Sequence, residues 1–358
     1  MALNPFKFLF PKKFLGIDTG TSSIKVVEIS RWGGGRTLEN YGEIKAAALF
    51  KESFRTFEKS THLVSSAFVS RAIRAILEEA RIKTKAAIFS IPDFSTFFTS
   101  FELPPMSEDE IPQAVRYTAP QYTPLPIGET TLDWRIIRGT PGDKKSTLKI
   151  LLIAVPNDVV AEYQRVAQMA GLELYALEAE VLGIVRSSIK ENKKVACLID
   201  LGVQSTTASI IDKGVLKKSY SFDFSSSQLT HAVSTALSID ETEAEEIKCK
   251  YGIMASDSEK DITKVLQLLI DPLLIEIKNI ASEFSQSENK DIEEIYLTGG
   301  TANLKGLREY FSENLKIKVE TPNPFSDLLY PPILAETLKE MGPRFTVAVG
   351  TALGGLGQ

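Results

Sequence analysis

Two stretches of the chain show the same alternation of short apolar runs and polar turns. The peptide Ile-Asp-x-Gly-x-x-Ser begins at Ile17 and again at Ile199, and in both places it joins two short, β-rich apolar runs. Apolar runs of this length on both sides of a Gly/Ser/Thr turn predict a β-hairpin. Because the two copies lie about half the chain apart, the pattern indicates two related halves.

Downstream of the first hairpin, the apolar spacing predicts a strand, a helix and a second strand. The first strand is expected near Thr37–Ala46, and the helix is expected to begin at Ser60, where apolar residues start to recur every three or four positions. The side chains on its apolar face are Leu63, Ala67, Phe68, Ala72, Ile76 and Leu77. The apolar run Ala86–Ile91, which ends before Pro92, predicts a buried strand.

Residues 94–177 form a separate pattern that is punctuated by proline-rich segments. It reads as strand, helix, strand, strand, helix and strand. The predicted elements cover 96–103, 107–118, 131–138, 148–155, 157–170 and 172–177. This order predicts a self-contained β-α-β-β-α-β unit inserted into the first half, of a kind that often presents a surface to a partner.

The order of the first half then resumes around the second hairpin. Predicted helices cover 179–189, 261–284 and 346–353, and two more begin near Ser227 and Glu241. Pro272 is expected to kink or split the long helix. The strand Glu294–Leu297 runs into a Thr-Gly-Gly turn, and a helix is expected from about Asn303.

The composition of the chain mainly excludes certain classes of protein and partner. At 358 residues the chain is too long for one core, so two or three domains are expected. The net charge of −5, without a basic stripe, argues against a nucleic-acid partner. No apolar run reaches the ~18 residues that span a bilayer, so no integral membrane span is expected. The two cysteines lack metal-ligand or disulfide spacing, which fits a reducing cytoplasm.

The repeated turns have the chemistry of phosphate cradles. Gly20 and Gly202 allow positive φ and a close approach of the backbone, so successive N–H groups can point at phosphate oxygens. Asp18 and Asp200 are expected to hold Mg²⁺ through bound waters. A single Asp before Gly is more often just a turn residue, and its repetition in both hairpins favours the functional interpretation.

Three further motifs follow in a fixed order around the second hairpin. They are Glu178–Gly183 before it, and Leu297–Leu304 and Ala348–Ala352 after it, and the helix Ala244–Lys248 lies between. With the two hairpins, these segments resemble the actin, sugar kinase and heat-shock chaperone ATPase superfamily. In that superfamily, Glu178–Gly183 looks like the first connecting helix and Leu297–Leu304 looks like the adenosine motif. Ala348–Ala352 looks like the second connecting helix, and Ala244–Lys248 looks like the helix that grips ribose and adenine. The resemblance covers most of the chain and implies an α/β, actin-like (ribonuclease H-like) two-domain ATPase fold.

Within that superfamily the sequence is most similar to the PilM family of type IV pilus assembly proteins, which is related to the cell-division protein FtsA. The likeness is carried by Phe14–Glu28, Glu102–Ser107 and Gln121–Pro126. FtsA normally has a C-terminal amphipathic membrane helix, whereas this sequence ends in Gly354–Gln358, and this difference favours PilM.

The resemblance implies a division of the chain into five parts. Domain 1 takes 1–93 and the connecting helix 178–193, the inserted FtsA/PilM-type (SHS2) subdomain takes 94–177, domain 2 takes 194–341, and 342–358 is the connecting helix that returns toward domain 1. The inserted subdomain replaces the outer subdomain of actin.

The resemblance also implies a site for ATP and Mg²⁺. The residues that match its cofactor-binding motifs are Asp18, Gly20, Thr21, Ser22, Ser23, Lys25, Asp200, Gly202, Ser205, Glu245, Lys248, Gly299, Gly300 and Asn303. Of these, Asp18 and Asp200 are assigned to the metal. Lys25 would add a positive charge at the phosphates, and its alternative is an exposed strand lysine.

The adenosine side of the site rests on two pairs of residues. Glu245 would accept from ribose hydroxyls while the Lys248 stem covers the base, although alone they would be a solvated ion pair. Gly299 and Gly300 would let the backbone lie flat against the adenosine, with Asn303 capping the helix or bonding the nucleotide.

Hydrolysis is expected to be slow or absent. Glu180 is the carboxylate placed to orient water, with Glu178 in reserve. The second turn carries Val203 and Gln204 where actin-like enzymes place further glycines, and these side chains are expected to restrict approach to the γ-phosphate.

The resemblance implies a cytoplasmic protein held at the inner membrane through its partners. Those partners would be the N-terminal tail of a PilN-like inner-membrane protein, bound in a groove between the inserted subdomain and domain 1, together with other pilus inner-membrane assembly proteins and a possible second copy of the chain. The alternatives are a small-molecule kinase of the same superfamily, an FtsA-like cell-division scaffold and a type II secretion scaffold. The inserted unit offers no clear catalytic Asp for a kinase.

Overall fold

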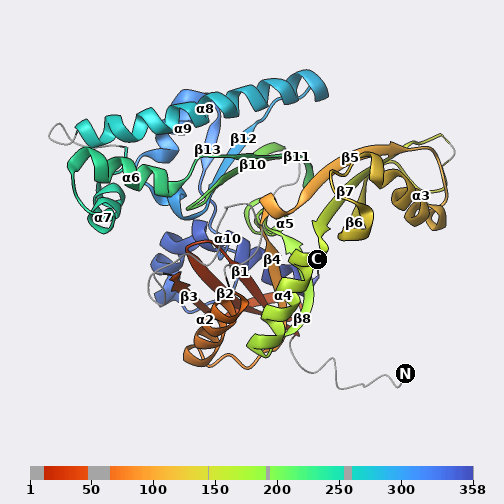
Figure 1. The fold of residues 1–358 in the computed structure, drawn as a ribbon, viewed down its shortest axis with the longest axis horizontal. Helices are drawn as coiled ribbons and strands as arrows, with labels where there is room; N and C mark the ends of the chain where they lie inside the picture. The colour runs from red at the N-terminus through yellow and green to blue at the C-terminus, as the bar shows by residue number, and fades with distance from the viewer. Residues whose placement is uncertain (1–11, 47–64, 144, 191–193, 254–259, 358) are drawn as a thin grey trace.

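The computed structural model describes residues 12–46, 65–143, 145–190, 194–253 and 260–357. In this part of the chain, two five-stranded sheets with the same internal order form two domains, and a three-stranded sheet extends from one side (Figure 1). Each five-stranded sheet begins with an antiparallel hairpin and continues with parallel strands. The two related halves that the repeated hairpin predicts are therefore present.

The first sheet has the strand order β3-β2-β1-β4-β8. Its strands are β1 (Lys12–Thr19), β2 (Ser23–Trp32), β3 (Gly35–Lys45), β4 (Ala86–Ile91) and β8 (Glu173–Ala179). Successive side chains of a strand point to opposite faces. Leu15 and Ile17 thus pack beneath α2 (Ser66–Glu79) and α4 (Asn157–Ala170), whereas Phe14 packs beneath α10 (Ala335–Leu356).

The helix predicted from Ser60 corresponds to α2. Ser65 is its N-cap, and the Ser65 hydroxyl accepts from the Phe68 N–H. The predicted start at residues 60–64 lies outside the described residues. From Val69 to Leu77 the apolar face is buried, as the spacing predicts for Ala72, Ile76 and Leu77. Ala67 and Phe68, also expected on this face, are exposed in the first turn of α2, so the prediction is wrong for them.

The second sheet has the order β11-β10-β9-β12-β13. Its strands are β9 (Val195–Leu201), β10 (Thr206–Asp212), β11 (Val215–Phe222), β12 (Glu294–Thr298) and β13 (Lys318–Glu320). The accompanying helices are α6 (Ser226–Leu237), α7 (Glu241–Tyr251), α8 (Lys260–Glu288) and α9 (Leu307–Leu315). Helix α8 runs without interruption through Pro272, so the expected split of this helix is wrong; Pro272 is exposed.

The inserted unit differs from the prediction in its last two elements. Its sheet has the order β5-β7-β6 and contains β5 (Phe97–Leu103), β7 (Leu148–Pro156) and β6 (Thr130–Arg138), with α3 (Ile111–Thr118) on one face. The predicted last strand is β8, which pairs with β4, and the predicted last helix is α4, which packs against α2. The unit is therefore not self-contained, because the apolar face of α4 is buried in the first domain.

Short 3₁₀ turns occupy several connections. They are η2 (Asp93–Ser95), η3 (Glu108–Glu110), η4 (Ala119–Gln121), η5 (Ile127–Glu129), η7 (Gly300–Asn303) and η8 (Pro332–Leu334). The inserted sheet contacts the second domain where β5 meets β11. There, the Lys149 ammonium lies 3.6 Å from a carboxylate oxygen of Glu288 on α8.

Two helices join the domains and cross in direct backbone contact. They are α5 (Glu180–Ser188) and α10, which are the predicted connecting helices (Figure 1). A Cβ atom built on Gly350 would lie 1.8 Å from the Gly183 carbonyl oxygen, and one built on Gly16 would lie 2.0 Å from the Ala348 oxygen. Glycine is required at these positions because α10 packs directly on the backbones of α5 and β1.

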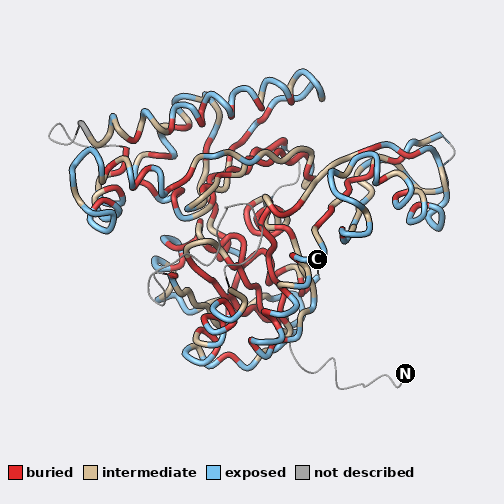
Figure 2. The backbone as a smooth tube through the Cα atoms, in the orientation of Figure 1, coloured by how far each residue is buried: buried red, intermediate tan, exposed pale blue. Residues whose placement is uncertain are grey.

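The buried parts of the chain gather in each sheet and along α10 (Figure 2). Among the helices of the described ranges, none combines the length and the apolar character that crossing a membrane requires.

Candidate functional site

The turns of the two hairpins lie at one junction between the domains. The first turn is 20–22, between β1 and β2, and the second is 202–205, between β9 and β10. Asp18 and Asp200 occupy equivalent positions just before these turns, and the negative charge of Asp18 raises the pKa of Asp200. The two hairpins also share a neighbour, because β1 packs along helix α10 and the Gly299 N–H, one residue after Thr298, donates to the Pro343 carbonyl of that helix over 2.9 Å. The two hairpins therefore converge beside α10.

Asp18 is paired with Lys25 across the first hairpin. The two residues are direct partners in the β1–β2 register, and the Lys25 ammonium donates to Asp18 Oδ2 over 3.3 Å. Both side chains are about nine-tenths buried. Lys25 is therefore not the exposed strand lysine of the alternative interpretation, because its charge lies within the site.

Asp200 is held at the end of β9 by the adenosine motif. The Thr298 hydroxyl donates to Asp200 Oδ1 over 3.0 Å. The protein packed around the Asp200 carboxylate raises its pKa, the Thr298 hydrogen bond lowers it and the Asp18 charge raises it again, to about 6. A carboxylate in such surroundings gains from a nearby cation.

The two turn glycines are required for space. The Gly202 N–H donates to the Ser205 carbonyl over 3.0 Å, and a Cβ on Gly202 would lie 2.7 Å from that oxygen. A Cβ on Gly20 would lie 3.0 Å from the Ser23 oxygen and about as near the Asp18 and Lys25 side chains as van der Waals contact allows. Neither glycine has positive φ, so the expected left-handed conformation is wrong, whereas the close backbone approach is present.

The site has the donors and acceptors that a metal-bound phosphate requires. The Thr206 hydroxyl and the Gln204 amide oxygen are buried in the second hairpin without a hydrogen-bond partner, and such atoms are ordinarily satisfied by a ligand or by water. Among the described residues, no group of three or more His, Cys, Asp or Glu side chains surrounds a metal position. Two carboxylates fit Mg²⁺, which keeps several of its waters and bridges phosphate oxygens.

Glu245 and Lys248 lie beside the second hairpin. The first N–H groups of α6, from Ser226 and Ser227, donate to the carbonyls of the second turn over 3.1 Å. Lys248 is 2% exposed and donates to the Ser226 hydroxyl over 2.7 Å, while its ammonium lies 2.6 Å from a carboxylate oxygen of Glu245. This pair is therefore not the solvated ion pair of the alternative interpretation: its lysine is buried and supports α6, which in turn supports the turn. A contact of these side chains with ribose or base stays a prediction.

The adenosine motif is a tight strand-to-turn connection. Gly299 has φ of 84°, and a Cβ there would lie 2.8 Å from Asp200 Oδ1, so both space and conformation require glycine. Gly300 begins η7, and no atom lies within 4 Å of the position of a Cβ on it. The Asn303 amide donates to the Glu340 carbonyl in α10. The α-helix expected from Asn303 begins only at Leu307, because η7 comes first. Its N-cap is Gly306, so the expected capping role of Asn303 is wrong.

The two candidate glutamates have different surroundings. Glu178 forms a two-pronged ion pair with Arg186, which also donates to the Gly350 carbonyl over 2.6 Å. The Glu178 carboxylate of β8 thus holds Arg186, and Arg186 in turn fastens α5 to α10, so the reserve candidate has a structural task. Glu180 is the half-buried first residue of α5, and its role with water stays a prediction.

The sequence analysis missed Asp93. This residue follows β4, is 7% exposed, and accepts the Val181 N–H at the start of α5 over 3.2 Å. Burial raises the pKa of Asp93, the Val181 hydrogen bond lowers it and the charge of Asp200 raises it, to about 7. Its position at the carboxyl end of a parallel strand, where α/β sheets bind ligands, was the available signal.

Replacing Asp93 by asparagine is expected to remove a pH dependence of stability. Because the folded pKa is raised, the native state binds more protons than the unfolded chain between about pH 4 and 7, and stability falls as pH rises through that window. The asparagine side chain keeps an acceptor for Val181 without the charge. At pH 8, without metal or nucleotide, we expect Asp93→Asn to be more stable by on the order of 2 kcal/mol. Urea unfolding at pH 5 and 8 measures the difference, and a variant that loses stability equally at both pH values contradicts this account.

Solved structures place the fold in a class. The chain superposes on a chain of a PilM-PilN type IV pilus biogenesis complex with a TM-score of 0.80, at 23% identity over 96% of this chain and 98% of that chain. It also superposes on MreB 5 of Spiroplasma citri bound to AMPPNP, with a TM-score of 0.54 at 13% identity over 96% and 95%. The paired hairpins and crossing helices thus define a two-domain, actin-like fold.

Sequence comparison narrows the class to a family. The cell division protein FtsA of Enterococcus faecalis is 21% identical over 86% of this chain and 78% of its own length. A family model described as type IV pilus assembly protein PilM matches residues 16–356. The chain belongs to this PilM family, as its sequence motifs predict.

Proposed function

We propose that this protein binds ATP with Mg²⁺ between its two domains and, in that state, binds the cytoplasmic tail of a PilN-like inner-membrane protein during pilus assembly. The observation that carries the nucleotide part is the convergence of Asp18 and Asp200 from equivalent hairpins. The proposed partner is supported by membership of the PilM family and by structural similarity to a chain of a PilM-PilN complex. The protein would then lie in the cytoplasm, at the membrane through its partner.

Different residues of the chain would contact the phosphates and the metal. The turns that contain Gly20 and Gly202 would offer backbone N–H groups to the phosphates, and Lys25 would balance their charge. Asp18 and Asp200 would hold Mg²⁺ through waters, and the metal would supply charge neutralisation between the β- and γ-phosphates. Because the two hairpins belong to different domains, occupancy would favour the closed arrangement.

We expect little or no hydrolysis. Glu178 is committed to Arg186, which leaves Glu180 as the carboxylate to orient water. The second turn carries side chains at Val203 and Gln204, and Gln204 presents a buried amide oxygen there. The side chains at these two positions would restrict the approach of the backbone to the γ-phosphate, which favours slow turnover.

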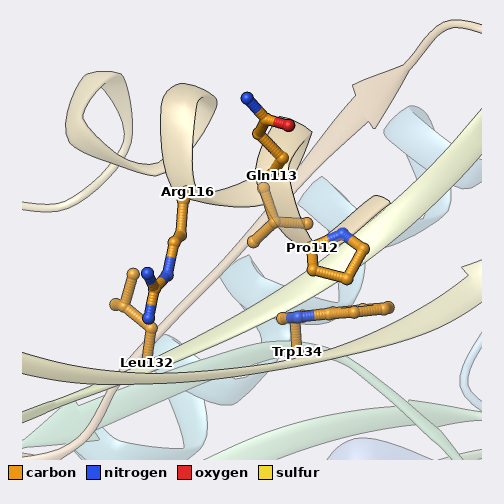
Figure 3. Close-up of a pocket in the computed structure, with 6 residues that line it drawn as sticks. Pro112, Gln113, Arg116, Leu132 and Trp134 are labelled. Carbon is orange, nitrogen blue, oxygen red and sulfur yellow. The ribbon is translucent and has the colours of Figure 1, made fainter. Parts of the chain in front are cut away.

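The family resemblance implies a groove between the inserted subdomain and domain 1 for the partner. We propose instead the groove between α3 and β6, which lies within the inserted subdomain. This groove has a volume of about 480 Å³ and is lined by Pro112, Gln113, Val115, Arg116, Leu132 and Trp134. In Figure 3, Trp134 and Leu132 form its floor while Arg116 reaches down from α3. β6 is an edge strand of its sheet, so an extended tail can pair with its backbone and place apolar side chains in the groove.

Replacing Trp134 by alanine is expected to weaken binding of a PilN-like tail peptide by at least about tenfold, because an aromatic anchor in a groove dominates such interfaces. Binding of Mg²⁺-ATP should not change. Titration calorimetry with ATP, Mg²⁺ and the peptide measures both affinities. Tyr117→Ala is the matched control, since Tyr117 is 81% exposed on α3 and does not line the groove.

The same titrations test the function as a whole. Binding of both ligands with negligible turnover supports the proposal. Rapid phosphorylation of a sugar or an acid would instead establish a kinase of this superfamily, and a parent protein that does not bind the peptide would remove the PilN-like partner.

A further inference from the structure

A buried tyrosine of α4 contacts the first phosphate turn. The hydroxyl oxygens of Tyr163 and Thr19 lie 3.1 Å apart, within hydrogen-bond distance, and the two residues are 2% and 0% exposed. Thr19 is the last residue of β1, between Asp18 and Gly20. This contact between two buried hydroxyls links the start of the turn directly to α4.

The other end of α4 is built into the inserted sheet. β7 ends at Pro156 and α4 begins at Asn157, with no loop between them. The Thr131 hydroxyl of β6 donates to the Asn157 side chain over 2.8 Å, and the Asn157 amide donates to the Gly128 carbonyl over 3.0 Å. Thr131 is the neighbour of Leu132, which lines the proposed peptide groove.

Helix α4 therefore spans from the groove strand to the nucleotide turn as one rigid element. Tyr163 lies six residues after Asn157, which corresponds to about 9 Å along the helix axis. Its ring packs edge-on against Phe89 of β4, with 6.0 Å between the ring centres, so the hydroxyl is held in one direction. Figure 1 shows α4 beside the first sheet, below the inserted subdomain.

We propose that Tyr163 is a positioning residue that couples the two ligand sites: through its hydrogen bond to Thr19, nucleotide at the first turn and peptide in the α3–β6 groove change each other's affinity. This inference rests on the proposed function. A movement of the turn on nucleotide binding shifts α4 through Tyr163, and α4 shifts β6 through Asn157. By thermodynamic linkage, the effect is equal in the opposite direction.

Hydrogen exchange on the full chain with saturating Mg²⁺-ATP tests the coupling without any peptide. In the parent protein, we expect slower exchange at residues 17–25 and also at 130–138 and 157–170. In Tyr163→Phe, which keeps the ring, protection at 17–25 should persist while the response of the two distant segments falls to less than about half. Tyr310→Phe is the matched control, because the Tyr310 hydroxyl bonds Asp271 in the second domain.

Titration calorimetry provides a second test of the coupling between the two ligand sites. In the parent protein, ATP should change tail-peptide affinity at least about fivefold, and in Tyr163→Phe this ratio should approach one while both ligands still bind. Thr19→Val removes the same hydrogen bond from the other side and should also lower this ratio, and the loss in the double variant should be smaller than the sum of the two single losses.

The outcomes separate the two proposals. Equal distant responses in parent and Tyr163→Phe, or no response beyond 17–25 in the parent, overturn the coupling and leave the proposed function in place. Absence of protection at 17–25 in the parent overturns ATP binding and the coupling together.

Discussion

Replacing Asp18 by alanine is expected to lower the affinity for Mg²⁺-ATP by at least about 100-fold, because the site loses one of the two carboxylates proposed to hold the metal. The Asp18 side chain is about nine-tenths buried, so water cannot replace the lost charge fully. Titration calorimetry with ATP and Mg²⁺ measures the loss. Affinity for ADP without Mg²⁺ should fall much less, since that ligand does not use the metal position.

Two comparisons make this test specific. Asp18→Asn keeps the size of the side chain and removes its charge, so it should reproduce most of the loss while thermal unfolding confirms that the protein is folded. Asp109→Ala removes an exposed carboxylate of the inserted unit and should bind as the parent does. Equal Mg²⁺-ATP affinity in Asp18→Ala and the parent would remove the metal role from Asp18.

Replacing Gly350 by alanine is expected to destabilise the folded protein by roughly 3 kcal/mol. The new methyl group would lie 1.8 Å from the Gly183 carbonyl oxygen, and a backbone atom cannot turn aside as a side chain does. Helices α5 and α10 must therefore separate, and the bond from Arg186 to the Gly350 carbonyl must stretch with them. Urea unfolding of parent and variant at one pH measures the difference.

Gly128→Ala is the matched control for this change. No atom lies within 4 Å of the position of a Cβ at Gly128, so the same substitution should alter the unfolding free energy by less than about 0.5 kcal/mol. If Gly350→Ala were as stable as Gly128→Ala, the close crossing of α5 and α10 would not exist in solution.

The hairpins, the connecting helices and most other elements were predictable because they depend on local patterns. The repeated peptide fixes strand, turn and strand within a few residues, and the apolar spacing of α2 identifies its buried face. The sheet that a strand joins depends on partners far along the chain. For this reason β8 and α4 were assigned to the inserted unit, although they complete the first domain.

The candidate site was also predictable only in part. Asp18 and Asp200 stand out because they recur in the same context, and the structure brings them together. Asp93 occurs once, after an ordinary strand, and its proximity to Asp200 arises only when β4 and β9 lie in adjoining domains. The contact between Tyr163 and Thr19 likewise joins distant segments that share no local pattern.

Because α10 packs on the first sheet, the first domain can complete its folding only after α10 has been synthesised. Helix α10 covers one face of the first sheet with Phe345, Val349 and Leu353, packed against residues such as Val27 that are synthesised some 300 positions earlier. The second domain needs no such late contribution to its sheet, since β9–β13 lie within 195–320. Until α10 has been synthesised, one apolar face of the first sheet stays uncovered. Chaperone protection of the first domain is therefore most valuable during that interval.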